Sequence, residues 1–197
     1  MIDDLIKSTR SIRRFEENAT IGRKTLEELV DLARHSASAM NRQPLKYILS
    51  CDPDTNAGIF STLKFAAALK EWNGPAQWER PSAYIVVLGD TSIASSFGCD
   101  HTIASQNIML GARDRGLGGC IIASINEAML RELLDIPSRY EILLVLALGK
   151  PAETVVVEPM PPDGNTSYWR DEQGVHHVPK RSLDEIILNP EKNNECN

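Results

Sequence analysis

Two nearly unbroken apolar runs constrain the fold most strongly. Residues 83–88 are apolar and rich in β-branched side chains, and residues 141–148 form the longest stretch of this kind. Continuous apolar runs of this length are typical of buried strands. We therefore expect a buried strand over 83–88 and the longest strand over 141–148, with shorter strands over 45–50 and 120–122.

Helical patterns occupy much of the chain between these strands. We expect helices over 2–9, 57–71 and 100–115. Another helix should begin at a capping box formed by Thr25 and Glu28, and one more should run from an N-cap at Asn126 to Leu134. Residues 72–82 have the turn formers and aromatics of a loop over a site. Beyond residue 151 the chain is proline-rich and polar, up to a short amphipathic stretch at 183–188. Because helices and strands do not alternate strictly, the order favours an α+β sheet over a doubly wound fold.

Length and composition limit the class of protein. The 197 residues fit one domain, and 42% hydrophobic with 24% charged residues is typical of a globular chain. The net charge of −6 argues against a nucleic-acid surface, and no apolar run approaches the roughly 20 residues that span a bilayer. The start lacks the pattern of a signal peptide, and the four cysteines are too scattered for a disulfide scaffold. We expect a cytoplasmic protein with no membrane or nucleic-acid partner.

Several common catalytic motifs are missing from the sequence. Gly116, Gly118 and Gly119 do not make the dinucleotide fingerprint GxGxxG, because Ile121 stands where the third glycine belongs. The sequence has no P-loop, GxSxG elbow or HExxH. The histidines have no spacing typical of a metal site. Hydrolase, kinase and zinc-enzyme interpretations are therefore disfavoured, and we expect no metal.

Three polar segments are candidates for ligand binding. Residues 7–14 carry four cations within eight positions, and arginine forks match phosphate oxygens well. Residues 38–44 include amide side chains that suit the edge of a heterocycle. Lys180 and Arg181 form a late basic pair. Each segment taken alone is also compatible with an ordinary solvated surface.

Taken in order, these segments resemble the motifs of the nitroreductase family of FMN-dependent oxidoreductases. Residues 9–15 resemble its RRSxRxF opening and residues 36–45 its APSxxNxQPW segment. Residues 116–121 resemble its GLGxCW stretch, 135–137 its LGIP turn, and 149–151 with 180–181 its ending. The resemblance covers nearly the whole chain. The departures are Thr9 for the first arginine, Ala37 for proline, and Leu45 and Ile121 for tryptophans.

The resemblance implies a fold, a cofactor and a set of binding residues. It implies a central, mostly antiparallel sheet surrounded by helices in an intertwined homodimer, with one FMN-binding domain over 1–197 whose tail, from about 152, extends over the partner. Helix 100–115 would be central to the dimer. The implied FMN-binding residues are Arg10, Ser11, Arg13, Ser38, Asn41, Gln43, Gly118, Gly119, Lys180 and Arg181. Arg10, Ser11, Lys180 and Arg181 would hold the phosphate and Arg13 the ring. Ser38, Asn41 and Gln43 would come from the other protomer.

The implied activity is transfer of a hydride from NAD(P)H through the flavin to a small nitroaromatic or quinone-like acceptor, by ping-pong chemistry without an obligatory acid or base. Residues 60–80, with Phe65, Trp72 and Trp78, could form a lid, or could simply pack in the core or an interface. The alternatives are specialised flavin chemistry on the same fold, a non-catalytic FMN-binding sensor, and an α+β interaction protein without cofactor.

Overall fold

The computed structural model describes residues 1–66, 69 and 72–188. By its internal contacts the chain divides into two compact units, Met1–Glu153 and Thr154–Asn197.

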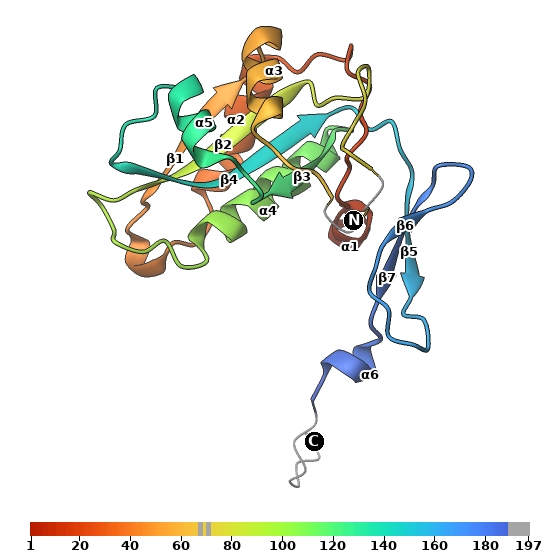
Figure 1. Cartoon of the computed structure of the whole chain (residues 1–197). Helices are drawn as coiled ribbons and strands as arrows, with labels where there is room; N and C mark the ends of the chain where they lie inside the picture. The colour runs from red at the N-terminus through yellow and green to blue at the C-terminus, as the bar shows by residue number, and fades with distance from the viewer. Residues whose placement is uncertain (67–68, 70–71, 189–197) are drawn as a thin grey trace, which may run out of the picture. The chain divides into compact units, whose positions relative to one another are not determined.

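The first unit is built on a four-stranded antiparallel sheet with strand order β1-β2-β4-β3 (Figure 1). Its strands are β1 (Leu45–Ser50), β2 (Ala83–Asp90), β3 (Gly118–Ile122) and β4 (Tyr140–Gly149). The two apolar runs are thus the central strands, and every residue of β2 is buried. The strands expected from the sequence and the α+β class are confirmed.

Helices cover both faces of this sheet, which explains why its central strands are apolar over most of their length. The helices are α1 (Ile2–Ser8), α2 (Arg23–Arg34), α3 (Pro53–Ser61), α4 (Asp100–Asp114) and α5 (Glu127–Leu133). On one face, Leu29 of α2 and Ile108 of α4 share a buried cluster with Ile85 of β2. On the other, Ile59 of α3 and its neighbours cluster with Tyr84 of β2. Successive residues of β2 therefore face opposite layers.

Two helix boundaries predicted from the sequence are wrong. Helix α2 begins after Gly22 as its N-cap, so Thr25 lies inside the helix and the expected capping box is not the start. Helix α3 starts at Pro53, where the Asp52 carboxylate accepts from the Thr55 N–H at 2.8 Å. It ends at Ser61, although a helix was expected over 57–71. Part of that range, 67–68 and 70–71, lies outside the described residues.

The physical reason for the shift in α3 lies in its ends. An aspartate N-cap followed by proline at the first helical position is a strong start signal, and it outweighs the apolar spacing that suggested a later start. Leu63 then forms an isolated bridge with Ile125, and Ala66 has a positive φ of 45°. Both features are incompatible with a continuing helix.

The second unit contains a three-stranded sheet that the sequence analysis missed. Strand β5 (Val155–Pro159) is parallel to β7 (His176–Lys180), and β6 (Trp169–Arg170) is antiparallel to β7. The short helix α6 (Leu183–Ile186) follows, capped by Ser182 within the expected amphipathic stretch. The prolines of this region indicated a chain without strands, whereas the β-branched run Val155–Val157 was the signal for a strand. Among the described residues, no helix is both long and apolar enough to cross a membrane.

Candidate functional site

The basic segment after α1 is fixed against strand β3. Ile12 donates its backbone N–H to the Gly119 carbonyl at 2.8 Å, and Ser11 forms a parallel bridge with Gly119. Further along, Phe15 pairs with Pro151 and its side chain is fully buried. The cations of this segment therefore lie on a backbone that is held at several points.

Arg10 and Ser11 lie at the end of α1. The Arg10 guanidinium folds back over that helix, with Nε donating to the Thr9 carbonyl at 2.6 Å and Nη2 to the Ile6 carbonyl at 3.0 Å. These bonds use two of the five guanidinium N–H groups. Ser11 is exposed. The pair places a positive charge and a hydroxyl at the surface, which suits an anionic ligand.

Arg13 is half-buried, and the carboxylate of Glu153 holds its backbone in place. The Glu153 Oε1 accepts from the backbone N–H of Arg13 at 2.5 Å and from that of Arg14 at 3.2 Å. Burial raises the pKa of the nearby Cys120 thiol to about 12, and the positive charge of Arg13 only partly opposes this. Cys120 therefore remains a neutral thiol, as expected for a cysteine in an apolar strand.

The glycines of β3 are required by packing within the protein. A Cβ on Gly118 would lie 2.7 Å from Ile12 Cγ1, and one on Gly119 would lie 2.3 Å from the Ala147 carbonyl oxygen. Both residues are buried. The close approach of the basic segment and of β4 is therefore a sufficient physical reason for glycine at both positions.

The polar segment 38–43 forms a tight loop whose end lies beside helix α4. Three of its non-glycine residues, Met40, Asn41 and Gln43, have positive φ values of 54°, 53° and 51°. The side chains of Asn41 and Gln43 are exposed, and Gln43 Nε2 donates to the Asn41 carbonyl at 3.2 Å. Positive φ is uncommon outside glycine, although asparagine tolerates it best. Such a conformation marks the loop as held by specific bonds.

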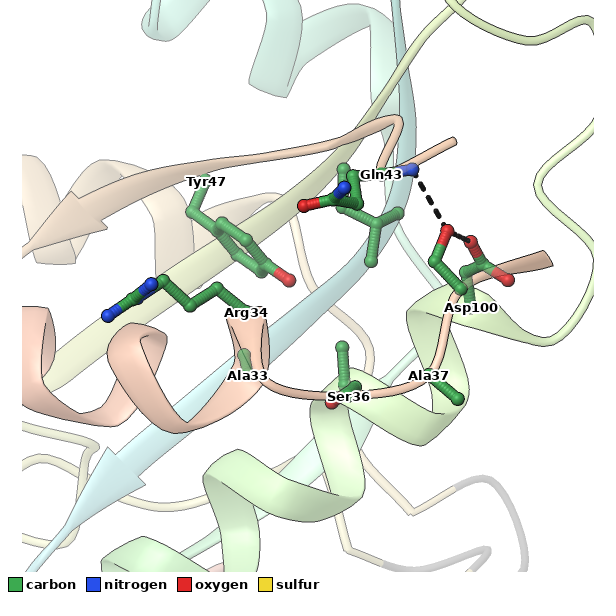
Figure 2. Close-up of a pocket in the computed structure, with 10 residues that line it drawn as sticks. Ala33, Arg34, Ser36, Ala37, Gln43, Tyr47 and Asp100 are labelled. Atoms are coloured by element: carbon green, nitrogen blue, oxygen red, sulfur yellow. Dashed lines mark hydrogen bonds between the residues drawn. The ribbon is translucent and has the colours of Figure 1, made fainter. Parts of the chain in front are cut away.

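Those bonds come from a buried carboxylate that sequence reasoning missed. Ser38 Oγ donates to Asp100 Oδ2 at 2.5 Å, and the Ala39 N–H donates to Asp100 Oδ1 at 3.1 Å. Ser38 Oγ also accepts from the Gln43 N–H at 2.9 Å (Figure 2). An acidic residue in the first turn of the helix expected over 100–115 was the signal that could have found Asp100.

A cavity of about 170 Å³ lies beside this loop. Figure 2 shows Tyr47, Gln43 and Asp100 around it, contributed by β1, the loop and α4. Burial, and secondarily the charge of Asp100, raises the pKa of Tyr47 to about 12. Tyr47 therefore presents a neutral phenol. Apolar side chains complete the wall at Ala33, Leu45 and Ala104.

The aromatic residues expected in a lid differ in their surroundings. Phe65 is buried and Trp72 is half-buried against the cluster of Ile59 and Tyr84. Trp78 is 68% exposed and has a positive φ of 80°. Phe65 and Trp72 thus have the packing role that was the alternative to a lid, whereas Trp78 is presented to solvent.

The late basic pair belongs to the second unit. Lys180 is the exposed last residue of β7, and Arg181 Nη1 lies 3.2 Å from Glu185 Oε1. Within the described part of the chain, no group of three or more histidine, cysteine or acidic side chains could hold a metal ion.

The second unit also holds a histidine between two carboxylates. His177 Nδ1 lies 2.5 Å from Glu158 Oε1, and Nε2 lies 3.2 Å from Asp171 Oδ2. The Trp169 ring stacks on the imidazole at a centroid distance of 4.1 Å. Hydrogen bonds to Asp171 and then Glu158 raise the pKa of His177 above its ordinary value. The arrangement favours the doubly protonated ring, in which both nitrogens are donors.

Comparison with known proteins identifies one family. The model described as the nitroreductase family matches residues 6–150. The chain is 25% identical over 181 residues to a protein named NADPH-dependent oxidoreductase from Staphylococcus epidermidis, with 80% of this chain and 68% of that protein covered.

Solved structures agree with this comparison. A nitroreductase family protein from Clostridium novyi NT is 28% identical, with a TM-score of 0.63 over 77% of this chain and 86% of that one. An FMN-dependent nitroreductase from Clostridium difficile R20291 is 21% identical, with a TM-score of 0.61 over 77% of this chain and 88% of that one.

Proposed function

The chain belongs to the nitroreductase family, and from that premise we propose that it is an FMN-dependent oxidoreductase. The proposed reaction passes a hydride from NAD(P)H to a small nitroaromatic or quinone-like electrophile, with donor and acceptor using one pocket in turn. When bound, FMN supplies the centre that accepts and returns the hydride. The observation that carries the proposal is the basic segment fixed along β3, which lies within the matched range.

The residues present fit the cofactor. A flavin phosphate carries close to two negative charges, so its desolvation must be offset by several cations and hydroxyls. Arg10 and Ser11 are a cation and a hydroxyl of this kind, and both belong to the first unit. Arg13 supplies a positive charge that favours extra negative charge on the ring. Gly118 and Gly119 contribute backbone groups rather than side chains.

We propose that the site is completed by a second copy of the chain. In a homodimer, Ser38, Asn41 and Gln43 would serve the partner's flavin, helix α4 would pack against its counterpart, and the unit from Thr154 onward would extend over the partner. Exposed apolar side chains support a need for burial by another chain. They include Leu183, at 68% exposed, and Ile186, at 59%. Large exposed apolar groups of this kind are often interaction sites.

The experiment is a spectroscopic reduction assay. The purified protein, reconstituted with FMN, is mixed anaerobically with NADH or NADPH while the flavin absorbance is followed. Bleaching by a nicotinamide and recovery with a quinone or nitroarene support the proposal. Bound flavin that neither donor reduces would instead favour a sensor role or specialised flavin chemistry. A protein that takes up no FMN would overturn the proposal.

Matched variants connect the assay to the site. Arg10→Ala is expected to weaken FMN binding, and more strongly at low ionic strength because the contact is between charges. Lys24→Ala removes an exposed cation from helix α2 and is the control. Equal FMN affinity in both variants would contradict the role of Arg10.

A further inference from the structure

We propose that Asp100 is a positioning residue for flavin binding, because it fixes Ser38 as a hydrogen-bond acceptor toward the ligand. This inference rests on the proposed function. It goes beyond it by assigning a role to a residue outside the expected binding set, and by stating which flavin groups Ser38 can meet.

Both oxygens of the Asp100 carboxylate accept hydrogen bonds from the loop. One oxygen accepts the Ser38 hydroxyl and the other accepts the Ala39 N–H, at 2.5 and 3.1 Å. The residue is 6% exposed and is the first residue of the 15-residue helix α4. The N-terminal end of a helix favours a negative charge. Asp100 is therefore well placed to remain an acceptor for both groups.

The bonding of Ser38 follows from the number of hydrogen bonds that its hydroxyl can donate and accept. A hydroxyl has one proton to donate and two lone pairs to accept with. The proton is directed to Asp100, and one lone pair receives the Gln43 N–H at 2.9 Å. One lone pair is left for a ligand. Ser38 can thus receive a bond from a ligand donor but has no proton to give.

This polarity selects among the groups of a flavin. The ring N3–H and the ribityl hydroxyls are donors, and Ser38 can accept from either. The ring carbonyl oxygens, the phosphate oxygens and N5 of the oxidised ring are acceptors, so each would direct a lone pair at the free lone pair of Ser38. Ser38 is therefore assigned to the pyrimidine N–H or to the ribityl chain, and not to the phosphate.

Asp100 also holds the backbone that presents Asn41 and Gln43. Their positive φ values, 53° and 51°, are disfavoured for residues other than glycine. The bonds at Ser38 and Ala39 fix one end of the loop to α4, and the Gln43 N–H closes it onto the same hydroxyl. Loss of the carboxylate would release both the hydroxyl proton and the loop.

A double-mutant cycle tests the proposal. The dissociation constant of FMN is measured by fluorescence titration of the apoprotein for the wild type, Asp100→Asn, Ser38→Ala and the double variant. In Asp100→Asn the amide N–H₂ can donate to Ser38, so the hydroxyl proton is freed and the polarity toward the ligand reverses. We expect about 10-fold weaker binding for each single variant, typical of the loss of one hydrogen bond between neutral groups. The double variant should be little weaker than either single one.

The cycle separates positioning from a purely structural role. Asp114→Asn, at the exposed far end of the same helix, is the control and should bind FMN as the wild type does. Additive losses in the double variant, or unchanged affinity in Asp100→Asn, would overturn the proposal. If Asp100→Asn does not fold, as judged by circular dichroism, Ser38→Ala and Ser38→Thr decide. Threonine should retain affinity and alanine lose it, and equal affinities would refute the role. A wild-type apoprotein that binds no FMN would instead refute the proposed function.

Discussion

Replacing Gly119 with alanine tests why β3 begins with paired glycines. The added Cβ would lie 2.3 Å from the Ala147 carbonyl oxygen and 2.8 Å from Leu148 Cδ2. The first of these contacts is with backbone, which cannot rotate away. Strand β3 would have to move from β4, and the bond between the Ile12 N–H and the Gly119 carbonyl would be strained with it.

The expected loss of stability is at the upper end of the range for overpacking. Inserting a methyl group into a well-packed site typically lowers the free energy of unfolding by ~1–3 kcal/mol. Because the clash here is with backbone, we expect the upper value, ~3 kcal/mol. For a chain of this length each kcal/mol lowers the Tm by roughly 2–4 °C. Gly119→Ala should therefore melt about 6–12 °C below the wild type.

The assay is thermal unfolding of the apoprotein, because that measurement excludes any effect of the cofactor. Gly22→Ala is the matched control, since a Cβ there would meet nothing within 4 Å. It should lower the Tm by no more than about 4 °C, the cost of a weaker N-cap. If Gly119→Ala has the same Tm as the wild type and loses only FMN affinity, the packing explanation is refuted. The glycine would then be required for binding of the ligand.

Three further changes probe the anchors of the two units. Glu153→Ala should weaken FMN binding about 10-fold by releasing the backbone of Arg13, whereas Glu153→Gln retains an acceptor and most of the affinity in the same titration. Asp52→Ala removes the cap of α3 and should lower the Tm by about 2–4 °C. The raised pKa of His177 means that its contribution to stability is present below about pH 6.5 and is lost as pH rises through the folded-state pKa. Trp169 fluorescence should follow this change, and His177→Gln should abolish the pH dependence.

Local sequence patterns correctly predicted the elements that are determined by neighbouring residues in the sequence. Residues 83–88 and, after Glu141, residues 142–148 are apolar because both faces of these strands are covered, and that is visible in the sequence. The start of α3 was missed because apolar spacing was weighted above the Asp52-Pro53 cap. Strand β5 was missed because prolines nearby obscured the run Val155–Val157.

The supporting residues of the site could not be predicted in the same way. Glu153 reaches the backbone of Arg13 across 140 positions of the chain, and Asp100 reaches Ser38 across 62. A motif names the residues that carry charge or amide groups, but it contains no information on which distant carboxylate orients them. Such bonds depend on the tertiary arrangement of α4 and of the segment after β4.

Strand β3 lies at one end of the first unit's sheet, with β4 on only one side of it. Sheet edges with unpaired N–H and C=O groups invite strands from other chains and so promote aggregation. Ser11 and Ile12 occupy the start of this edge through their contacts with Gly119. The segment that carries the proposed phosphate ligands thus also shields a surface prone to self-association, so changes that loosen it endanger the protein's colloidal stability as well as its chemistry.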